Sequence, residues 1–205
     1  MTVRESYQNR FDTLLQRLAT GIEGLIREYL QDVPRIDRVG ARAKSVDRFV
    51  AKSEKLTDGR PKYSDPLAQI QDQIGARIIT FYLSDVAAVA KVVETYFRAV
   101  ETKDLVPESE WEFGYFGRHY ILFTPSDVIE PDMDRSQVPD FFELQIKTLF
   151  QHAWSEAEHD LGYKAGAVPL NADEKRRLAF TAAQSWGADR IFDELYLERF
   201  NGQVN

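Results

Sequence analysis

The sequence predicts an α+β domain in which helices flank a mixed sheet. Over residues 4–31, apolar side chains recur at steps of three and four, the spacing of one buried helix face. Two other stretches, 77–83 and 141–146, are rich in β-branched and aromatic residues, which are typical of strands. At 205 residues the chain is long enough for one such domain with its own core.

The first third of the chain is expected to be mostly helical. The helix at 4–31 ends before Pro34, which cannot continue it. A second helix is expected over 44–55, and the Thr-Asp-Gly-Arg-Pro sequence that follows at 57–61 is a turn. Asp65-Pro66 then begins a short helix, because Asp is a good cap and Pro suits the first helical turn.

Strands and helices alternate in the rest of the chain. After the strand at 77–83, Ser84 and Asp85 cap the next helix. Residues 125–139 contain three prolines and several acids and are expected to form a loop. The remaining expected elements are a helix at 85–99, strands at 100–106, 119–124 and 141–146, and helices at 148–162 and 173–199.

Composition excludes several classes of protein. Hydrophobic residues make up 43% of the chain and charged residues 29%, as in ordinary globular proteins. The formal net charge of −7 argues against a general nucleic-acid coat protein, a class that is usually basic. We expect no membrane segment, because no apolar run approaches the roughly 20 residues that span a bilayer. The chain has no cysteine, which excludes disulfides and thiolate zinc sites and agrees with a cytoplasmic location.

Two carboxylates are placed where strands could bring them together. Asp72 comes just before a buried strand, in the sequence Asp-Gln-Ile-Gly-Ala-Arg. Glu143 lies within the strand at 141–146, where alternation puts Glu143 and Gln145 on one face and apolar residues on the other. Mg²⁺ commonly takes one or two carboxylates and leaves its other positions to water and phosphate. These acids therefore predict a magnesium-dependent phosphoryl-transfer site.

Basic residues gather on the N-terminal side of these acids. Lys44 and Lys52 are about two helical turns apart, so with Arg42 they would line one side of a helix start and grip a triphosphate. Arg77 offers a flat guanidinium that can stack on a base or bind phosphate. The basic residues of this stretch are Arg42, Lys44, Arg48, Lys52, Lys55, Arg60 and Lys62.

Each fragment alone also has an ordinary structural explanation. Asp72 could simply pair with Arg77, and Glu143 and Lys147 could be surface charges on a solvated strand. Tyr115 could be a core residue, and the basic stretch an exposed helix. The order of the fragments along the chain is what favours a functional site.

That order resembles the synthetase domain of the RelA/SpoT family, which makes guanosine tetra- and pentaphosphate. The matching pieces are Arg-x-Lys-Ser, Asp-x-x-Gly-x-Arg, Gly-Tyr, Glu-x-Gln-x-x-Thr and Glu-His-x-x-x-Tyr-Lys. The resemblance covers residues 38–165, and it is closest to the small stand-alone synthetases, without hydrolase or regulatory domains. It implies a mainly antiparallel sheet flanked by helices, of nucleotidyltransferase type. We expect a single domain in which an N-terminal helix at 1–34 and a C-terminal helix at 173–200 flank this core.

The resemblance also implies a reaction and the residues that perform it. ATP would give its β,γ-pyrophosphate to the 3′-hydroxyl of GDP or GTP. Asp72 and Glu143 would hold Mg²⁺, and Glu143 would help to deprotonate the acceptor hydroxyl. The residues implied for ATP binding are Arg42, Lys44, Lys52 and Arg77, and those for acceptor binding are Tyr115, His119, Gln145, Thr148, His159 and Lys164.

The largest departure from the family pattern lies on the acceptor side. The family's Gly-Tyr-Arg-Ser-x-His reads Gly-Tyr-Phe-Gly-Arg-His here, so Phe116 and Gly117 replace an arginine and a serine. Just upstream, Glu110-Trp-Glu112 replaces basic residues, and acids there disfavour an anionic acceptor.

Two alternatives therefore stay open. One is a toxin-type relative that pyrophosphorylates either the 3′ end of tRNA or adenine nucleotides. For tRNA, the basic 35–62 stretch would be the binding surface. The other is a non-catalytic nucleotide-binding relative. By analogy with small relatives, we also expect a homo-oligomer formed through the terminal helices.

Overall fold

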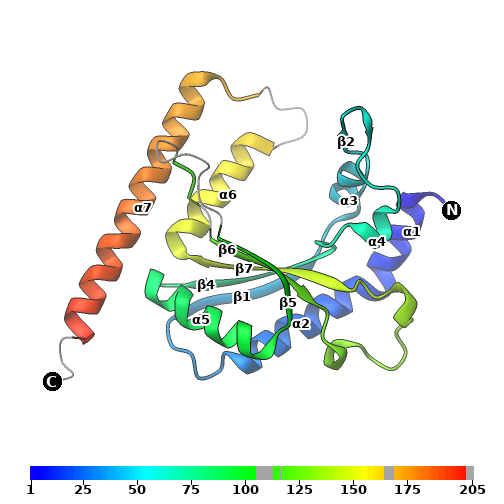
Figure 1. Ribbon diagram of the computed structural model, residues 1–205, viewed down its shortest axis with the longest axis horizontal. Helices are drawn as coiled ribbons and strands as arrows, with labels where there is room; N and C mark the ends of the chain where they lie inside the picture. The colour runs from blue at the N-terminus through cyan, green and yellow to red at the C-terminus, as the bar shows by residue number, and fades with distance from the viewer. Residues whose placement is uncertain (105–112, 116, 164–168, 202–205) are drawn as a thin grey trace.

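A five-stranded sheet forms the centre of the protein (Figure 1). The computed structural model describes residues 1–104, 113–115, 117–163 and 169–201. In spatial order the strands are β1 (Ile36–Ala43), β4 (Ile74–Thr80), β7 (Phe141–Thr148), β6 (Arg118–Phe123) and β5 (Ala99–Asp104). Neighbouring strands are antiparallel except β4 and β7, which run parallel. The predicted α+β fold with a mixed, mainly antiparallel sheet is therefore confirmed.

Strand β1 was not anticipated by the sequence patterns. It contains Asp37 and Gly40, residue types that are depleted in strands, and Val39 is its one buried side chain. It forms because it can pair along its length with β4, where Arg42 lies opposite Gly75. The expectation that Arg42 lies at a helix start is therefore wrong, since Arg42 lies near the end of an edge strand.

Helices cover both faces of the sheet (Figure 1). The N-terminal helical stretch comprises α1 (Val3–Arg10), a π-helical turn (Phe11–Leu15) and α2 (Gln16–Tyr29). Together with α5 (Leu83–Tyr96), α2 covers one face, and α6 (Leu149–Tyr163) and α7 (Ala172–Asn201) lie on the other. The main core forms between the sheet and the layer made of α2 and α5. Phe142, Leu144 and Ile146 of β7 are fully buried in it. No helix of the described residues is long and apolar enough to cross a membrane.

The segment between β1 and β4 places the basic residues at one end of the sheet. It comprises α3 (Val46–Ser53), a small hairpin of β2 (Leu56–Thr57) and β3 (Arg60–Pro61), and α4 (Pro66–Gln69). The expected turn and short helix are both present, and the Asp65 side chain caps α4 by accepting the Ala68 N–H at 3.3 Å. The ring of Phe49 on α3 stacks on Tyr7 of α1 at 3.7 Å between centroids, which anchors α3.

The long C-terminal helix α7 is fastened at its far end to the start of α5. The ring of Tyr196 stacks on Tyr82 at 4.5 Å between centroids. The carboxylate of Asp193 accepts the backbone N–H of Ser84 at 2.9 Å. The guanidinium of Arg35 lies 4.6 Å from the centre of the Tyr196 ring and also binds the buried carboxylate of Asp85. The position of α7 is thus fixed by ring stacking, a hydrogen bond and a cation–π contact together.

Gly117 lets the chain pass very close to β7 as it enters β6. A Cβ atom added there would lie 2.2 Å from the Ile146 carbonyl oxygen and 2.5 Å from Cγ of Lys147. The serine of the family pattern therefore cannot be accommodated without moving the backbone of β6 or β7.

We predict that Gly117→Ala lowers the free energy of unfolding by about 1–3 kcal/mol, the usual cost of overpacking. Urea unfolding of the variant and the native chain measures the difference. Gly187→Ala on α7 is the matched control, because an added Cβ there meets no atom within 4 Å and alanine favours a helix. Equal stability of the Gly117→Ala variant and the native chain would show that β6 and β7 can move apart at no cost.

Candidate active site

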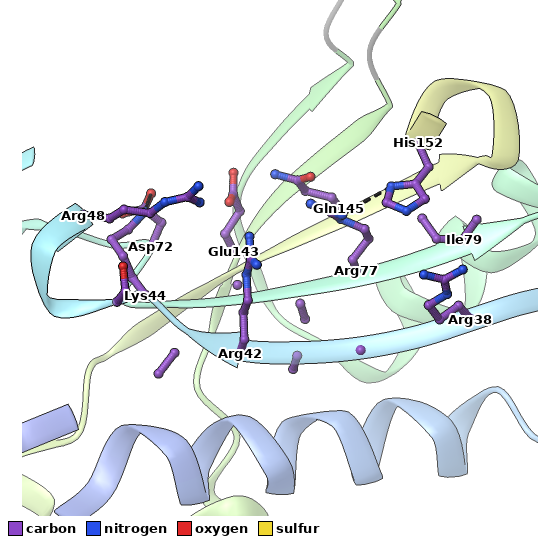
Figure 2. A pocket seen from close by; sticks show the side chains of 16 residues that line it. Arg38, Arg42, Lys44, Arg48, Asp72, Arg77, Ile79, Glu143, Gln145 and His152 are labelled. Atoms are coloured by element: carbon purple, nitrogen blue, oxygen red, sulfur yellow. Dashed lines mark hydrogen bonds and ion pairs between the residues drawn. The ribbon is translucent and has the colours of Figure 1, made fainter. Parts of the chain in front are cut away.

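A pocket of about 390 Å³ opens on the sheet face opposite α2 (Figure 2). Strands β1, β4 and β7 form its floor, and α3 and α6 supply side chains at its two ends. Its polar lining side chains are Arg38, Arg42, Lys44, Ser45, Arg48, Asp72, Arg77, Glu143, Gln145 and His152. The pocket therefore combines two carboxylates with several cations.

The parallel pairing of β4 and β7 brings the two carboxylates into one site. Gly75 of β4 lies opposite Glu143 of β7, and Asp72 stands three residues before Gly75. A side chain at Gly75 would meet nothing within 4 Å, so the glycine leaves open space beside Glu143. The alternation predicted for β7 is confirmed, with Glu143 and Gln145 facing the pocket and apolar residues facing the core.

Asp72 is held by two lysines through one of its oxygens. Nζ of Lys44 lies 3.0 Å and Nζ of Lys52 2.8 Å from Oδ2 of Asp72. Burial alone would raise the pKa of Asp72, but the two lysines outweigh it and hold the pKa below its usual value. The other oxygen, Oδ1, is buried and has no hydrogen-bond partner among the described residues. Asp72 is therefore ionised at neutral pH and keeps one oxygen for a ligand.

Glu143 is paired with a histidine from the neighbouring strand. Nδ1 of His119 lies 3.3 Å from Oε1 of Glu143, and His119 stands directly opposite Gln145 in the β6–β7 register. Burial would raise the pKa of Glu143, but the hydrogen bond and the charge interaction with His119, together with a hydrogen bond from Gln145, outweigh it and lower the pKa. Nε2 of His119 and Oε1 of Gln145 are buried without partners among the described residues. Two of the predicted acceptor-binding residues, His119 and Gln145, thus lie beside Glu143, and each has a buried polar atom that is not hydrogen-bonded to the described residues.

The predicted ATP-binding residues also converge on the pocket. Arg42 and Arg77 both point into it from adjacent strands, and Lys44 lines its α3 end beside Asp72 (Figure 2). Lys52 is not a lining residue, but its Nζ also contacts Asp72. Arg77 does not pair with Asp72; its guanidinium instead contacts α6, with Nη1 2.8 Å from Oε1 of Glu156.

Several lining residues, among them Arg38, Arg48 and His152, were not predicted as site residues. Arg38 lies four residues before Arg42 on β1 and lines the same pocket, so it was missed along with the strand itself. His152 lies on α6, and its Nδ1 is 3.3 Å from Nη1 of Arg77. Its position four residues before Glu156 puts both on one face of the helix, a signal that the spacing already contained.

Other predicted acceptor residues lie away from the pocket lining. Tyr115 is only 6% exposed and packs with Trp154, and its hydroxyl donates to Asp189 of α7. The hydroxyl of Thr148 donates to the same Asp189 oxygen. His159 is exposed on α6, and Lys164 lies outside the described residues. Tyr115 thus occupies the core position that was its alternative interpretation.

Lys147 is buried rather than a surface charge. It is 5% exposed, and its Nζ donates a hydrogen bond to Oγ of Ser155 at 2.9 Å. Burial, and then the nearby charge of Arg77, lower its pKa to about 8. The site face of β7 therefore continues under α6 as a polar layer.

Comparison with known proteins connects this geometry to a family. A family model described as a region found in RelA / SpoT proteins matches residues 41–168. Among curated relatives, GTP pyrophosphokinase YjbM of Bacillus subtilis is 28% identical over 88% of this chain and 81% of its own length. GTP pyrophosphokinase YwaC of the same bacterium is 27% identical over 96% of this chain and 91% of its own length.

A solved structure shows the same fold. Small alarmone synthetase 1 from Bacillus subtilis, bound to its product pppGpp, superposes with a TM-score of 0.70 and 23% identity. The match covers 95% of this chain and 96% of that one. Because the family model covers more than half of the sequence, the chain belongs to the RelA/SpoT family.

Proposed function

We propose that this protein is a GTP/GDP 3′-pyrophosphokinase that transfers the β,γ-pyrophosphate of ATP to the 3′-hydroxyl of GDP or GTP, yielding (p)ppGpp and AMP. The observation that carries the proposal is the pocket itself, in which Asp72 and Glu143, both with lowered pKa values, face a band of arginines and lysines. A triphosphate and a metal ion together need that combination of charges. The GTP pyrophosphokinase names of the curated relatives support the same reaction, and we expect it to take place in the cytoplasm.

The carboxylates fit Mg²⁺ as the metal. Oδ1 of Asp72 is a buried, unpartnered carboxylate oxygen, and Mg²⁺ prefers oxygen ligands. Among the residues that the structure describes, no group of three or more histidines and acids is placed to hold a metal. Asp72 and Glu143 would hold the ion with water and phosphate in its remaining positions. Bound there, Mg²⁺ would neutralise charge on the pyrophosphoryl group during transfer.

The basic side chains would bind and orient ATP. Arg42 and Arg77 point into the pocket from neighbouring strands and can stack on the faces of the adenine ring. Lys44 and Lys52 both pair with the Asp72 carboxylate. When a metal ion binds and neutralises that carboxylate, the two lysines can bind the phosphates instead. Fixing the triphosphate from both ends would align the bond that breaks with the incoming hydroxyl.

Glu143 and His119 would receive the acceptor. Because the pKa of Glu143 is lowered, the group is a carboxylate at neutral pH and can accept a hydrogen bond from the 3′-hydroxyl. The unpartnered Nε2 of His119 and Oε1 of Gln145 can bind polar groups of the same nucleotide. Tyr115 would stack on the acceptor base, which requires its ring to leave its contacts with Trp154 and Asp189.

We predict that Asp72→Asn and Glu143→Gln each reduce kcat/KM by more than about 100-fold, because each removes charge that acts on the transferring group. Radiolabelled ATP with GDP or GTP, at saturating Mg²⁺, measures the transfer. Glu101→Gln, an exposed acid on β5, is the control and should keep normal activity. Near-normal transfer by either site variant would remove that residue from the proposed site.

Tyr115→Ala should raise the KM of the acceptor at least about fivefold and leave the KM of ATP within twofold, since stacking on a base contributes about 1–3 kcal/mol. The same assay with GDP, GTP, ATP and deacylated tRNA as acceptors tests acceptor identity. Equal increases in both KM values would show that Tyr115 serves the fold and not the acceptor. Transfer to tRNA alone would replace the nucleotide acceptor with the tRNA alternative.

We also propose that the chain forms a homo-oligomer through its terminal helices. The outer side of α7 exposes large apolar side chains, with Phe180 64%, Ile191 58% and Leu195 55% accessible. Apolar surface of this extent marks an interaction site in many proteins. Light scattering at micromolar concentration should give a multiple of the 23.6 kDa chain mass, and Leu195→Glu should lower it. A native chain that remains monomeric would contradict this proposal.

A further inference from the structure

We propose that Glu156 and His152 of α6 are positioning residues that hold the Arg77 guanidinium in place for the donor nucleotide. Nη1 of Arg77 lies 2.8 Å from Oε1 of Glu156 and 3.3 Å from Nδ1 of His152. The two α6 residues are one helical turn apart, so they contact the guanidinium from the same side. The inference rests on the proposed role of Arg77 in binding ATP.

Arg77 needs such a contact because the nearby cation Lys147 repels it. Lys147 lies under α6, and its Coulombic interaction with Arg77 is repulsive. Arg38 approaches His152 from β1 on the same side of the pocket. The carboxylate of Glu156 is the negative charge in direct contact with Arg77 and offsets these cations. Without it, the long side chain would lose its preferred position across the pocket from Arg42.

The Arg77–Glu156 ion pair matters more for the ordering of the Arg77 side chain than for the stability of the fold. The side chains of Arg77 and Glu156 are 28% and 53% exposed, and ion pairs at that exposure contribute little to folding. Holding a flexible side chain in its binding position before the ligand arrives nevertheless improves affinity, because less freedom is lost on binding. Exposure also means that Glu156 can be replaced without disturbing the core.

His152 makes this arrangement dependent on protonation. Arginine can only donate, so Nδ1 of His152 must accept and carry no proton. The groups that act on His152 are Arg77 on β4, Glu156 on α6, Arg38 on β1 and Lys147 on β7. Burial and then Arg77 keep its pKa below the usual value, so the ring is neutral at pH 7. Protonation at lower pH would turn the contact with Arg77 into repulsion.

The test is the affinity of a non-hydrolysable ATP analogue, measured by calorimetry at pH 7.5. Glu156→Gln should weaken binding about fivefold, the effect of ordering one long side chain on binding. Asp160→Asn removes the same charge one turn further along α6 and should leave the affinity within twofold. In kinetic assays, Glu156→Gln should raise the KM of ATP and leave the KM of GDP unchanged.

A double variant separates positioning from a general structural effect. In an Arg77→Ala background, Glu156→Gln should cause no further loss of affinity, because the residue it positions is absent. A full fivefold loss in that background, or no loss in the native background, would overturn the inference. His152→Gln, which keeps an acceptor but cannot titrate, should preserve affinity at pH 7.5 and lessen its fall between pH 6.5 and 5. Failure of the proposed reaction would appear separately, as a native chain that binds the analogue but transfers nothing.

Discussion

The parallel pairing of β4 with β7 is the constraint on which the site depends. Every other neighbouring pair in the sheet is antiparallel. Within this pair, Gly75 lies opposite Glu143 and Arg77 opposite Gln145. One register therefore determines where both the acids and the stacking arginine lie in the pocket. Phe142, Leu144 and Ile146, all fully buried, fix that register. A slip of one residue would turn these side chains to the pocket and bury Glu143 in the apolar core.

The second feature of the site is a local excess of positive charge on an acidic protein. The whole chain carries a formal charge of −7, yet most charged residues that line the pocket are arginines and lysines. These cations keep Asp72 ionised despite its burial and create a region that attracts phosphates. Without a nucleotide, the positive charge is partly neutralised within the protein, by Asp72 on the lysines and by Glu156 on Arg77.

Sequence periodicity predicted those parts of the site that depend on local pattern. The alternation of β7 predicted which face Glu143 and Gln145 occupy. The lysine spacing predicted that Lys44 and Lys52 lie on one side of the chain, but not that both contact Asp72. Strand β1 was not predicted because its sequence is poor in strand-forming residues, and its strand conformation depends on pairing with β4.

Contacts between distant segments could not be predicted from a single sequence. Tyr115 binds Asp189, 74 positions away, and Arg77 contacts His152, 75 positions away. Both contacts depend on how α6 and α7 lie over the sheet, and that is decided by packing instead of local preference. The same applies to Lys147, whose burial under α6 is invisible in a strand that otherwise alternates regularly.

The central claim is that Asp72 and Glu143 act on one metal ion. The most direct test is a double-mutant cycle on kcat/KM with Asp72→Asn, Glu143→Gln and the double variant, at saturating Mg²⁺. If the two acids hold the same ion, their effects will not add, and the double variant will be about as active as the more damaged single variant. A double variant whose loss equals the product of the two single losses would show that the carboxylates act independently and would contradict the account.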